Sequence, residues 1–176
     1  MPAAPRHPPP SERLIFRRWH ADDLPLARSL WGDPRVSALI SRAPLTDAQV
    51  HERLTAELAA DDLHGVQYWP LFLRSTDEFV GCCGLHPHDP ARGSLELGFH
   101  LIPAAWGQGL ASEAARAVVG SAFTQFSARA LFAGHHPDNT ASRHVLRKLG
   151  FRLTHSELYP ATGLLHPSYW LTPEDR

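Results

Sequence analysis

The spacing of apolar positions predicts four helices along the chain. In each of them, apolar side chains recur three or four residues apart and so share one face. The predicted helices begin at Asp22, after Thr46, at Ala111 and at Thr140. Asp22 or Asp23 is expected to cap the first helix and Thr46 the second, and Gly150 ends the last helix in the left-handed conformation that glycine favours.

Short or alternating apolar runs between these helices predict strands. They cover residues 14–17, 68–73, 79–85, 94–102, 131–133, 151–154 and 168–171, and residues 87–93 and the Pro- and Gly-containing stretch before Ser168 are expected to be loops. The order is a strand, two helices, three strands, a helix, a strand, a helix and two strands. This order predicts an α/β fold of the α+β type: one domain with a mixed, mostly antiparallel seven-stranded sheet and helices on both faces.

Length and composition narrow the class of protein. The 176 residues fit one domain at 12–176, and residues 1–11 are predicted to be a disordered tail because five of the first ten are proline. A net charge of -1 argues against a nucleic-acid partner. No apolar run approaches the roughly 20 residues that span a bilayer, and no signal-like segment is present, so we expect a cytoplasmic protein without a membrane partner.

The cysteines and paired histidines do not predict a metal site. Cys82 and Cys83 are neighbours on a predicted strand, so their side chains point to opposite faces and suit neither a disulfide nor a metal. The pairs His86/His88 and His135/His136 raise a metal hypothesis, but we interpret them as loop histidines because of the adjacent prolines and the opposed directions of the second pair. No metal is therefore expected.

The stretch 105–114 is the most informative in the chain. An alternating run ends there in a turn with Gly107 and Gly109, and a helix follows at once. Free backbone amides at a helix N-terminus bind phosphate oxygens, and glycines let the ligand approach closely. The turn lacks the lysine of a nucleotide-triphosphate loop and the third glycine of a dinucleotide fingerprint. It indicates either a coenzyme-like ligand or an ordinary strand-to-helix connection.

Four stretches in order resemble one family. They are Glu12–Arg17, Leu95–Phe99 with Trp106–Ala111, Asn139–Ser142 and Lys148–Phe151. The chain resembles the GNAT superfamily of N-acetyltransferases over about residues 12–172, and most closely its RimJ/RimL-like branch of ribosomal-protein and related N-acetyltransferases. Trp106 departs from the Arg or Gln of the superfamily's phosphate-loop pattern, but tryptophan is usual in this branch.

The resemblance implies acetyl-CoA as co-substrate and assigns residues to it. The main chain at Leu101 and Ile102 is expected to pair with the pantetheine arm and to aim an amide at the thioester oxygen. Asn139 and Ser142 are expected on the other side of the arm. The pyrophosphate loop would comprise Trp106, Gly107, Gln108, Gly109, Leu110, Ala111 and Ser112.

Proton transfer is assigned to residues near the same loop. Glu96 resembles the general base of histone-type members, and it is either that base or a surface or salt-bridged carboxylate. Strand alternation places Glu96, Gly98 and His100 on one face, and His100 is a second candidate base or a packing residue. Ser142 resembles a proposed leaving-group acid, or it bonds local backbone; Leu146 stands where many members carry the acidic tyrosine.

The predicted function is transfer of an acetyl group from acetyl-CoA to a primary amine, directly within a ternary complex. The acceptor is either a protein N-terminus or a small amine. The protein is expected to be a monomer or a homodimer. Acceptor choice is expected to lie between the first two helices and in residues 158–169. Glu57, Asp61 and Asp62 either serve a polyamine or form a solvated helix end. The alternative is a non-catalytic acyl-CoA-binding sensor or assembly protein.

Overall fold

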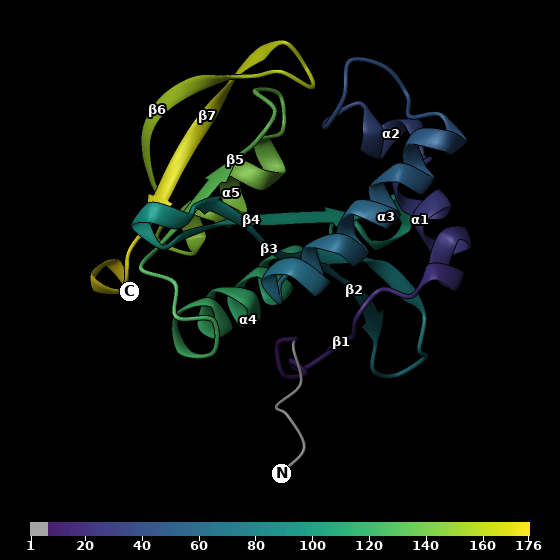
Figure 1. Cartoon of the computed structure of the whole chain (residues 1–176), viewed down its shortest axis with the longest axis horizontal. Helices are drawn as coiled ribbons and strands as arrows, with labels where there is room; N and C mark the ends of the chain where they lie inside the picture. The colour runs from purple at the N-terminus through teal and green to yellow at the C-terminus, as the bar shows by residue number, and fades with distance from the viewer. Residues whose placement is uncertain (1–6) are drawn as a thin grey trace.

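One seven-stranded sheet runs through the molecule (Figure 1), and the computed structural model describes residues 7–176. The strands lie in the order β1-β2-β3-β4-β5-β7-β6, and every neighbouring pair is antiparallel except β4 with β5. Their bounds are β1 Leu14–Phe16, β2 Tyr68–Leu73, β3 Phe79–Asp89, β4 Ser94–Leu101, β5 Ala130–Gly134, β6 Arg152–Tyr159 and β7 Leu164–Leu171. The predicted fold class is confirmed.

Helices cover both faces of this sheet. The α-helices are α1 Leu24–Trp31, α2 Pro34–Ser37, α3 Asp47–His64, α4 Leu110–Thr124 and α5 Thr140–Lys148, and short 3-10 turns are η1 Ala21–Asp23, η2 Pro90–Arg92, η3 Pro103–Ala105 and η4 Pro173–Asp175. One buried cluster joins the sheet to α4 and α5, and a second joins it to α1 and α3. Cys83 belongs to the first cluster and Cys82 to the second, which confirms that the two thiols face opposite ways.

Two segments predicted to be loops are strand in part: residues 87–89 belong to β3, and the stretch before Ser168 contains the end of β6 and the start of β7. β3 continues to Asp89, so His86 and His88 lie on a strand. Pro87 is tolerated there because it is opposite Leu95, whose main-chain groups point away from β3, and because it lies beyond the end of β2, so no ladder hydrogen bond needs its amide. The segment before Ser168 is instead the tip of a hairpin between β6 and β7. All of β6 is exposed, so its sequence carries no alternation of buried and exposed positions to indicate its length.

The helix ends follow the predicted chemistry in two of three places. Thr46 accepts a hydrogen bond from the Gln49 amide at 3.2 Å, and Gly150 has a φ of +91°. For α1, Asp23 is the N-cap residue as predicted, but its side chain makes no capping hydrogen bond to the helix. The Asp23 carboxylate instead accepts hydrogen bonds from Arg17 and from the His20 amide.

Only the second half of the predicted tail, residues 7–11, belongs to the described structure. Its residues 1–6 lie outside the described residues. At its other end, the Ser11 hydroxyl donates a hydrogen bond to Glu113 of α4 at 2.6 Å.

The feature of the sheet that matters most for function is the short pairing of β4 with β5. These strands pair only from Ser94 with Ala130 to Glu96 with Phe132, whereas β4 pairs with β3 along its whole length. Beyond Glu96 the two parallel strands diverge. The edge of β4 from Leu97 to Leu101 therefore faces an opening in the middle of the sheet.

We expect opposite effects of alanine at two glycines. In Gly84→Ala, the new Cβ would fall on the Gln67 carbonyl oxygen and 2.7 Å from the Tyr68 Cα, and these backbone atoms move only if β2 separates from β3. The free energy of unfolding should fall by about 1–3 kcal/mol, as in other overpacked cores. Urea unfolding followed by circular dichroism measures it.

Gly120→Ala is the matched control. Its Cβ meets no atom within 4 Å, and alanine favours the interior of α4, so stability should stay the same or rise. A Gly84→Ala protein as stable as Gly120→Ala would contradict this description of the β2–β3 contact.

Candidate active site

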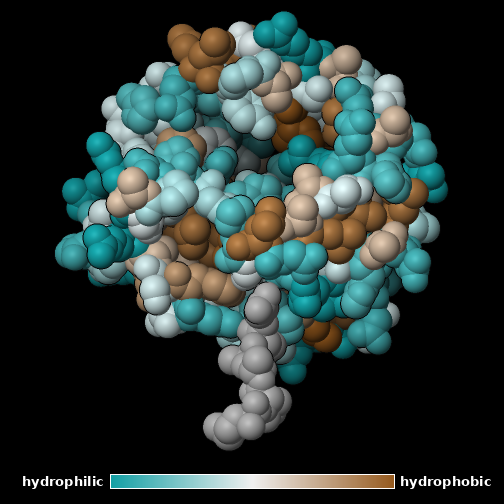
Figure 2. Space-filling model, in the orientation of Figure 1, coloured by the Kyte–Doolittle hydropathy of each residue, from teal (hydrophilic) through white to brown (hydrophobic). Residues whose placement is uncertain are grey.

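A cavity of about 310 Å³ occupies the opening between β4 and β5. It reaches the size range of ligand pockets, and a hollow is visible near the centre of the upper half of Figure 2. The lining comes from β4, the end of β5, α5, the β6–β7 hairpin and the α2–α3 region. From these last three it includes Asn139, Ser142, Leu146, Glu157, Tyr159, His166, Val36, Leu39, Ile40 and Arg53.

The glycine-rich turn beside the cavity presents free amides. Gly107 and Gly109 have φ values of +73° and +76°, a left-handed conformation suited to glycine, and Gly109 is the N-cap of α4. In the described structure, the first main-chain amide of this segment with a hydrogen-bond partner is that of Glu113, which donates to Gly109 O at 3.2 Å. The amides of residues 107–112 remain available to an anion at the positive end of the helix.

Contacts from the start of the chain hold this turn in place. The Arg13 guanidinium donates to the Glu113 carboxylate at 2.6 Å and to the Gln108 carbonyl at 3.0 Å. The Trp106 indole donates to the Leu101 carbonyl at 2.9 Å. The turn is therefore fixed to both β1 and β4 before any ligand arrives.

The main chain of β4 provides one of the two predicted donors. The Ile102 amide already donates to the Val80 carbonyl at 3.0 Å, so it is not available to a thioester oxygen. Because main-chain groups alternate in direction along an antiparallel pair, the Phe99 and Leu101 amides point away from β3, toward the cavity. Leu101, which the sequence singled out, and Phe99, which it did not, thus both present a main-chain amide to the cavity.

The opposite wall is built at the start of α5. The Asn139 side chain accepts a hydrogen bond from the Ser142 amide at 3.0 Å and so caps the helix. Ser142 is buried and lines the cavity together with Leu146. Within the described residues its hydroxyl makes no hydrogen bond, so it is free to contact a bound molecule.

Glu96, Gly98 and His100 all line the cavity on the predicted face of β4. Burial raises the pKa of the Glu96 carboxyl above its ordinary value of 4.5, and nearby His86 and His88 only partly oppose the shift. Tyr68 packs directly on Gly98, where a Cβ would overlap the phenol ring. The carboxyl is thus a stronger base than an exposed glutamate, and it faces the cavity.

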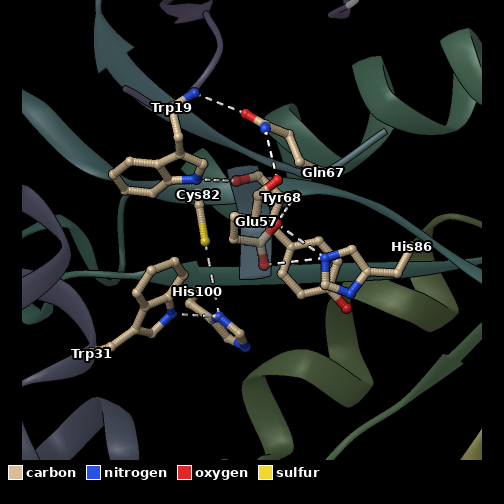
Figure 3. A network of polar contacts seen from close by, with 8 residues as sticks. All are labelled: Trp19, Trp31, Glu57, Gln67, Tyr68, Cys82, His86 and His100. Atoms are coloured by element: carbon tan, nitrogen blue, oxygen red, sulfur yellow. Dashed lines mark hydrogen bonds and ion pairs between the residues drawn. The ribbon is translucent and has the colours of Figure 1, made fainter. Parts of the chain in front are cut away.

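His100 has the opposite character. Burial lowers its pKa from 6.5 to about 3, and the positive charges of Arg53 and His86 add to the decrease. Its Nδ1 accepts a hydrogen bond from the Trp31 indole at 3.2 Å (Figure 3). The imidazole is therefore neutral at physiological pH and poorly suited to take up a proton.

Two carboxylates of α3 are buried structural groups. Glu57 accepts a hydrogen bond from the Tyr68 amide at 2.7 Å and contacts His86 Nε2 at 3.0 Å, and the rings of Tyr68 and His86 stack (Figure 3). Asp61 is fully buried and forms an ion pair with Arg18. Because Glu57 and Asp61 are buried, the predicted solvated helix end is wrong for both, whereas Asp62 is exposed as that prediction expects. None of the three lines the cavity, so the structure does not bring them together as a polyamine site there.

Arg53 of α3 is a cavity residue that sequence reasoning missed. Its guanidinium lies 5.0 Å from the centre of the Trp31 ring and its Nε is shielded from solvent. The spacing along α3 could have indicated this position. Arg53 lies three residues after Val50 and four before Glu57, so it shares the helix face that these two buried residues turn inward.

The predicted site residues separate into two groups. Seven of them line the cavity: Glu96, His100, Leu101, Trp106, Ala111, Asn139 and Ser142. Gly107, Gln108, Gly109, Leu110 and Ser112 form the adjoining turn and first turn of α4, and Ile102 packs between the two cores. Over residues 7–176, no group of three or more metal-ligating side chains is positioned to hold a metal, and no helix could cross a membrane.

Comparison with known proteins places the chain in a family. The model of the acetyltransferase (GNAT) domain matches residues 13–152. An uncharacterized N-acetyltransferase, p20, of Bacillus licheniformis is 29% identical over 143 residues, which cover 81% of this chain and 80% of that protein.

Solved structures share the fold at lower identity. A GNAT-family acetyltransferase from Bacillus anthracis superposes with a TM-score of 0.80 at 23% identity, covering 93% of this chain and 97% of that one. The ribosomal-protein acetyltransferase RimL in complex with coenzyme A superposes with a TM-score of 0.79 at 16% identity, covering 94% and 97%. With its divergent central strands and its free amide turn, the chain belongs to the GNAT family of acetyltransferases.

Proposed function

We propose that this acetyltransferase moves an acetyl group from acetyl-CoA to a primary amine, by direct attack within a ternary complex. The observation that carries the proposal is the cavity between β4 and β5, which has free amides at one end and a buried carboxyl on its wall. The amine is that of a protein N-terminus or a small molecule.

The donor fits the residues around the turn. The amides of residues 107–112 would bind its pyrophosphate, and the main chain of β4 and the start of α5 would flank its pantetheine arm. Neither Gly107 nor Gly109 presents a side chain to obstruct the diphosphate. When bound, the donor supplies the thioester carbonyl and a thiolate leaving group.

The protein's own groups move the protons and stabilise the charge. Glu96, directly or through water, accepts the proton that the ammonium must lose before its nitrogen can attack. As the N–C bond forms and the C–S bond breaks, the Leu101 amide stabilises the negative charge on the carbonyl oxygen. The Ser142 hydroxyl would protonate the departing sulfur and in turn accept the second proton that the nitrogen loses as the amide forms, so that it returns to its neutral form.

Other routes are less favourable. Burial raises the pKa of Cys82 and Cys83, so these thiols remain protonated and are weak nucleophiles for a covalent intermediate. Neutral, buried His100 is a weaker candidate base than Glu96. The combination of a carboxylate base, Glu96, with the lack of a reactive thiol therefore supports direct transfer of the acetyl group to the amine.

Gly109→Trp should abolish acetyl-CoA binding, because the indole would occupy the space of the diphosphate beside the amides. Titration calorimetry with acetyl-CoA measures the affinity. Gly65→Trp is the control: Gly65 is also left-handed, with a φ of +69°, has no atom near its Cβ and does not line the cavity. Equal acetyl-CoA affinity in the two variants would refute the assignment of the turn.

Glu96→Gln should lower kcat/KM by about 10²–10⁴-fold, the usual contribution of a general base. In the unaltered enzyme, activity should rise with pH as Glu96 loses its proton. Because burial raises its pKa, this limb should lie above the ordinary value of 4.5. The variant should lose the limb, and the deficit should shrink at high pH, where solvent removes the amine proton.

The measurement is a pH–rate profile by thiol release across a panel of amines and N-terminal peptides. Glu157→Gln is the control, since Glu157 also lines the cavity but is half exposed and contacts His155. Because the charge of Glu157 helps to raise the pKa of Glu96, this variant should keep the acidic limb and move it to lower pH. An unchanged acidic limb in Glu96→Gln would remove it as the base. Silence across the whole panel with retained acetyl-CoA binding would favour the non-catalytic sensor.

A further inference from the structure

Arg53 is a positive charge in the wall of the cavity without a counter-ion from the described protein. It lines the cavity, and no ion pair or hydrogen bond of its side chain is found within residues 7–176. On the same side of the sheet, Arg17 pairs with Asp23 and Arg18 with Asp61. The guanidinium of Arg53, by contrast, is left without a carboxylate partner among the described residues.

The immediate surroundings keep this guanidinium in place. Its cation lies over the Trp31 ring at 5.0 Å, and the Trp31 indole is itself held by His100 at 3.2 Å. The Nε atom is shielded from water without a hydrogen-bond acceptor. The terminal guanidinium nitrogens are not shielded in this way, and Arg53 lines the cavity, so a ligand there that supplies an acceptor to these nitrogens gains affinity.

The position of Arg53 points to the acceptor rather than the donor. It shares the wall with Val36, Leu39 and Ile40, whereas the amide turn belongs to α4 on the opposite core. The loop after α2 contacts the β6–β7 hairpin, where the Arg42 amide donates to the Ala161 carbonyl at 3.1 Å. This contact bounds the acceptor end of the cavity.

We propose that the acetyl acceptor carries a carboxylate and that Arg53 binds it. A lone guanidinium would repel an acceptor with only positive charge, whereas a carboxylate matches its planar pair of donors. Glu96 would then face the amine of the same molecule. The proposal rests on the proposed function, and the carboxylate belongs either to a small amino acid or to an acidic residue next to a peptide N-terminus.

The test uses acceptors that differ only in one charge. β-Alanine and γ-aminobutyrate are compared with their amides, and the tripeptide amide Ser-Asp-Tyr with Ser-Asn-Tyr, which separates the two sources. The unaltered enzyme should favour the carboxylate by about tenfold or more in kcat/KM in at least one series, as expected for a hydrogen bond to a charged group.

Arg53→Gln should remove this preference by raising KM for the carboxylate acceptor while changing the amide acceptor little. Arg53→Lys should restore part of it. Arg28→Gln, which removes an arginine that pairs with Asp47 on the surface, should leave the preference intact. Equal loss for both acceptors in Arg53→Gln, or no preference in the unaltered enzyme, would overturn the proposal.

Two measurements keep the outcome interpretable. Thermal unfolding reports whether Arg53→Gln still folds; if it does not, Arg53→Lys provides the comparison. If no amine is acetylated, the proposed function fails, and calorimetric binding of the same carboxylates and amides to the CoA-saturated protein tests Arg53 separately. Binding that requires both the carboxylate and Arg53 supports the inference, and its absence overturns it.

Discussion

The divergence of two parallel strands is the constraint on which the site depends. β4 keeps full pairing with β3 but leaves β5 after Glu96. A strand edge inside a sheet would normally carry unsatisfied main-chain groups. Here those groups face a cavity, so an extended molecule with amides of its own can complete the pairing. The free edge of β4 can thus bind such a molecule through main-chain groups alone, whatever side chains it carries.

Burial divides the polar groups around this opening by chemical role. Glu57 and Asp61 are buried and matched with His86, the Tyr68 amide and Arg18, and so they hold α3 against the sheet. Glu96 is desolvated and has no arginine partner within residues 7–176, and burial raises its pKa. His100 is desolvated beside positive charge, which lowers its pKa and keeps it neutral. The same physical cause, loss of water, therefore favours the uncharged form of both groups and shifts their pKa values in opposite directions.

The two ends of the cavity differ in how they are built. At the glycine-rich turn, backbone geometry dominates: left-handed glycines, a helix N-terminus and contacts from Arg13 and Trp106 that fix the turn. At the other end, side chains from α2, α3 and the β6–β7 hairpin form the wall, with Arg53 among them. One end thus presents main-chain groups in a local conformation, whereas the other presents individual side chains from distant parts of the chain.

The sequence alone determined the order of the strands and of the four longer helices, the fold class, the amide turn and the face of β4 that carries Glu96 and His100. These follow from helix and strand periods and glycine conformations, which are local properties. It did not determine the four-residue helix α2, which is too short to show a period, or the lengths of β3 and β6, where a proline and a fully exposed edge strand disguise the pattern. Tertiary structure alone decided that the Ile102 amide donates a hydrogen bond to the Val80 carbonyl, that Glu57 is buried against the Tyr68 amide, and that Arg53 reaches the cavity. These outcomes depend on which distant groups meet and how much water they lose, and neither is encoded in the spacing of residues along the chain.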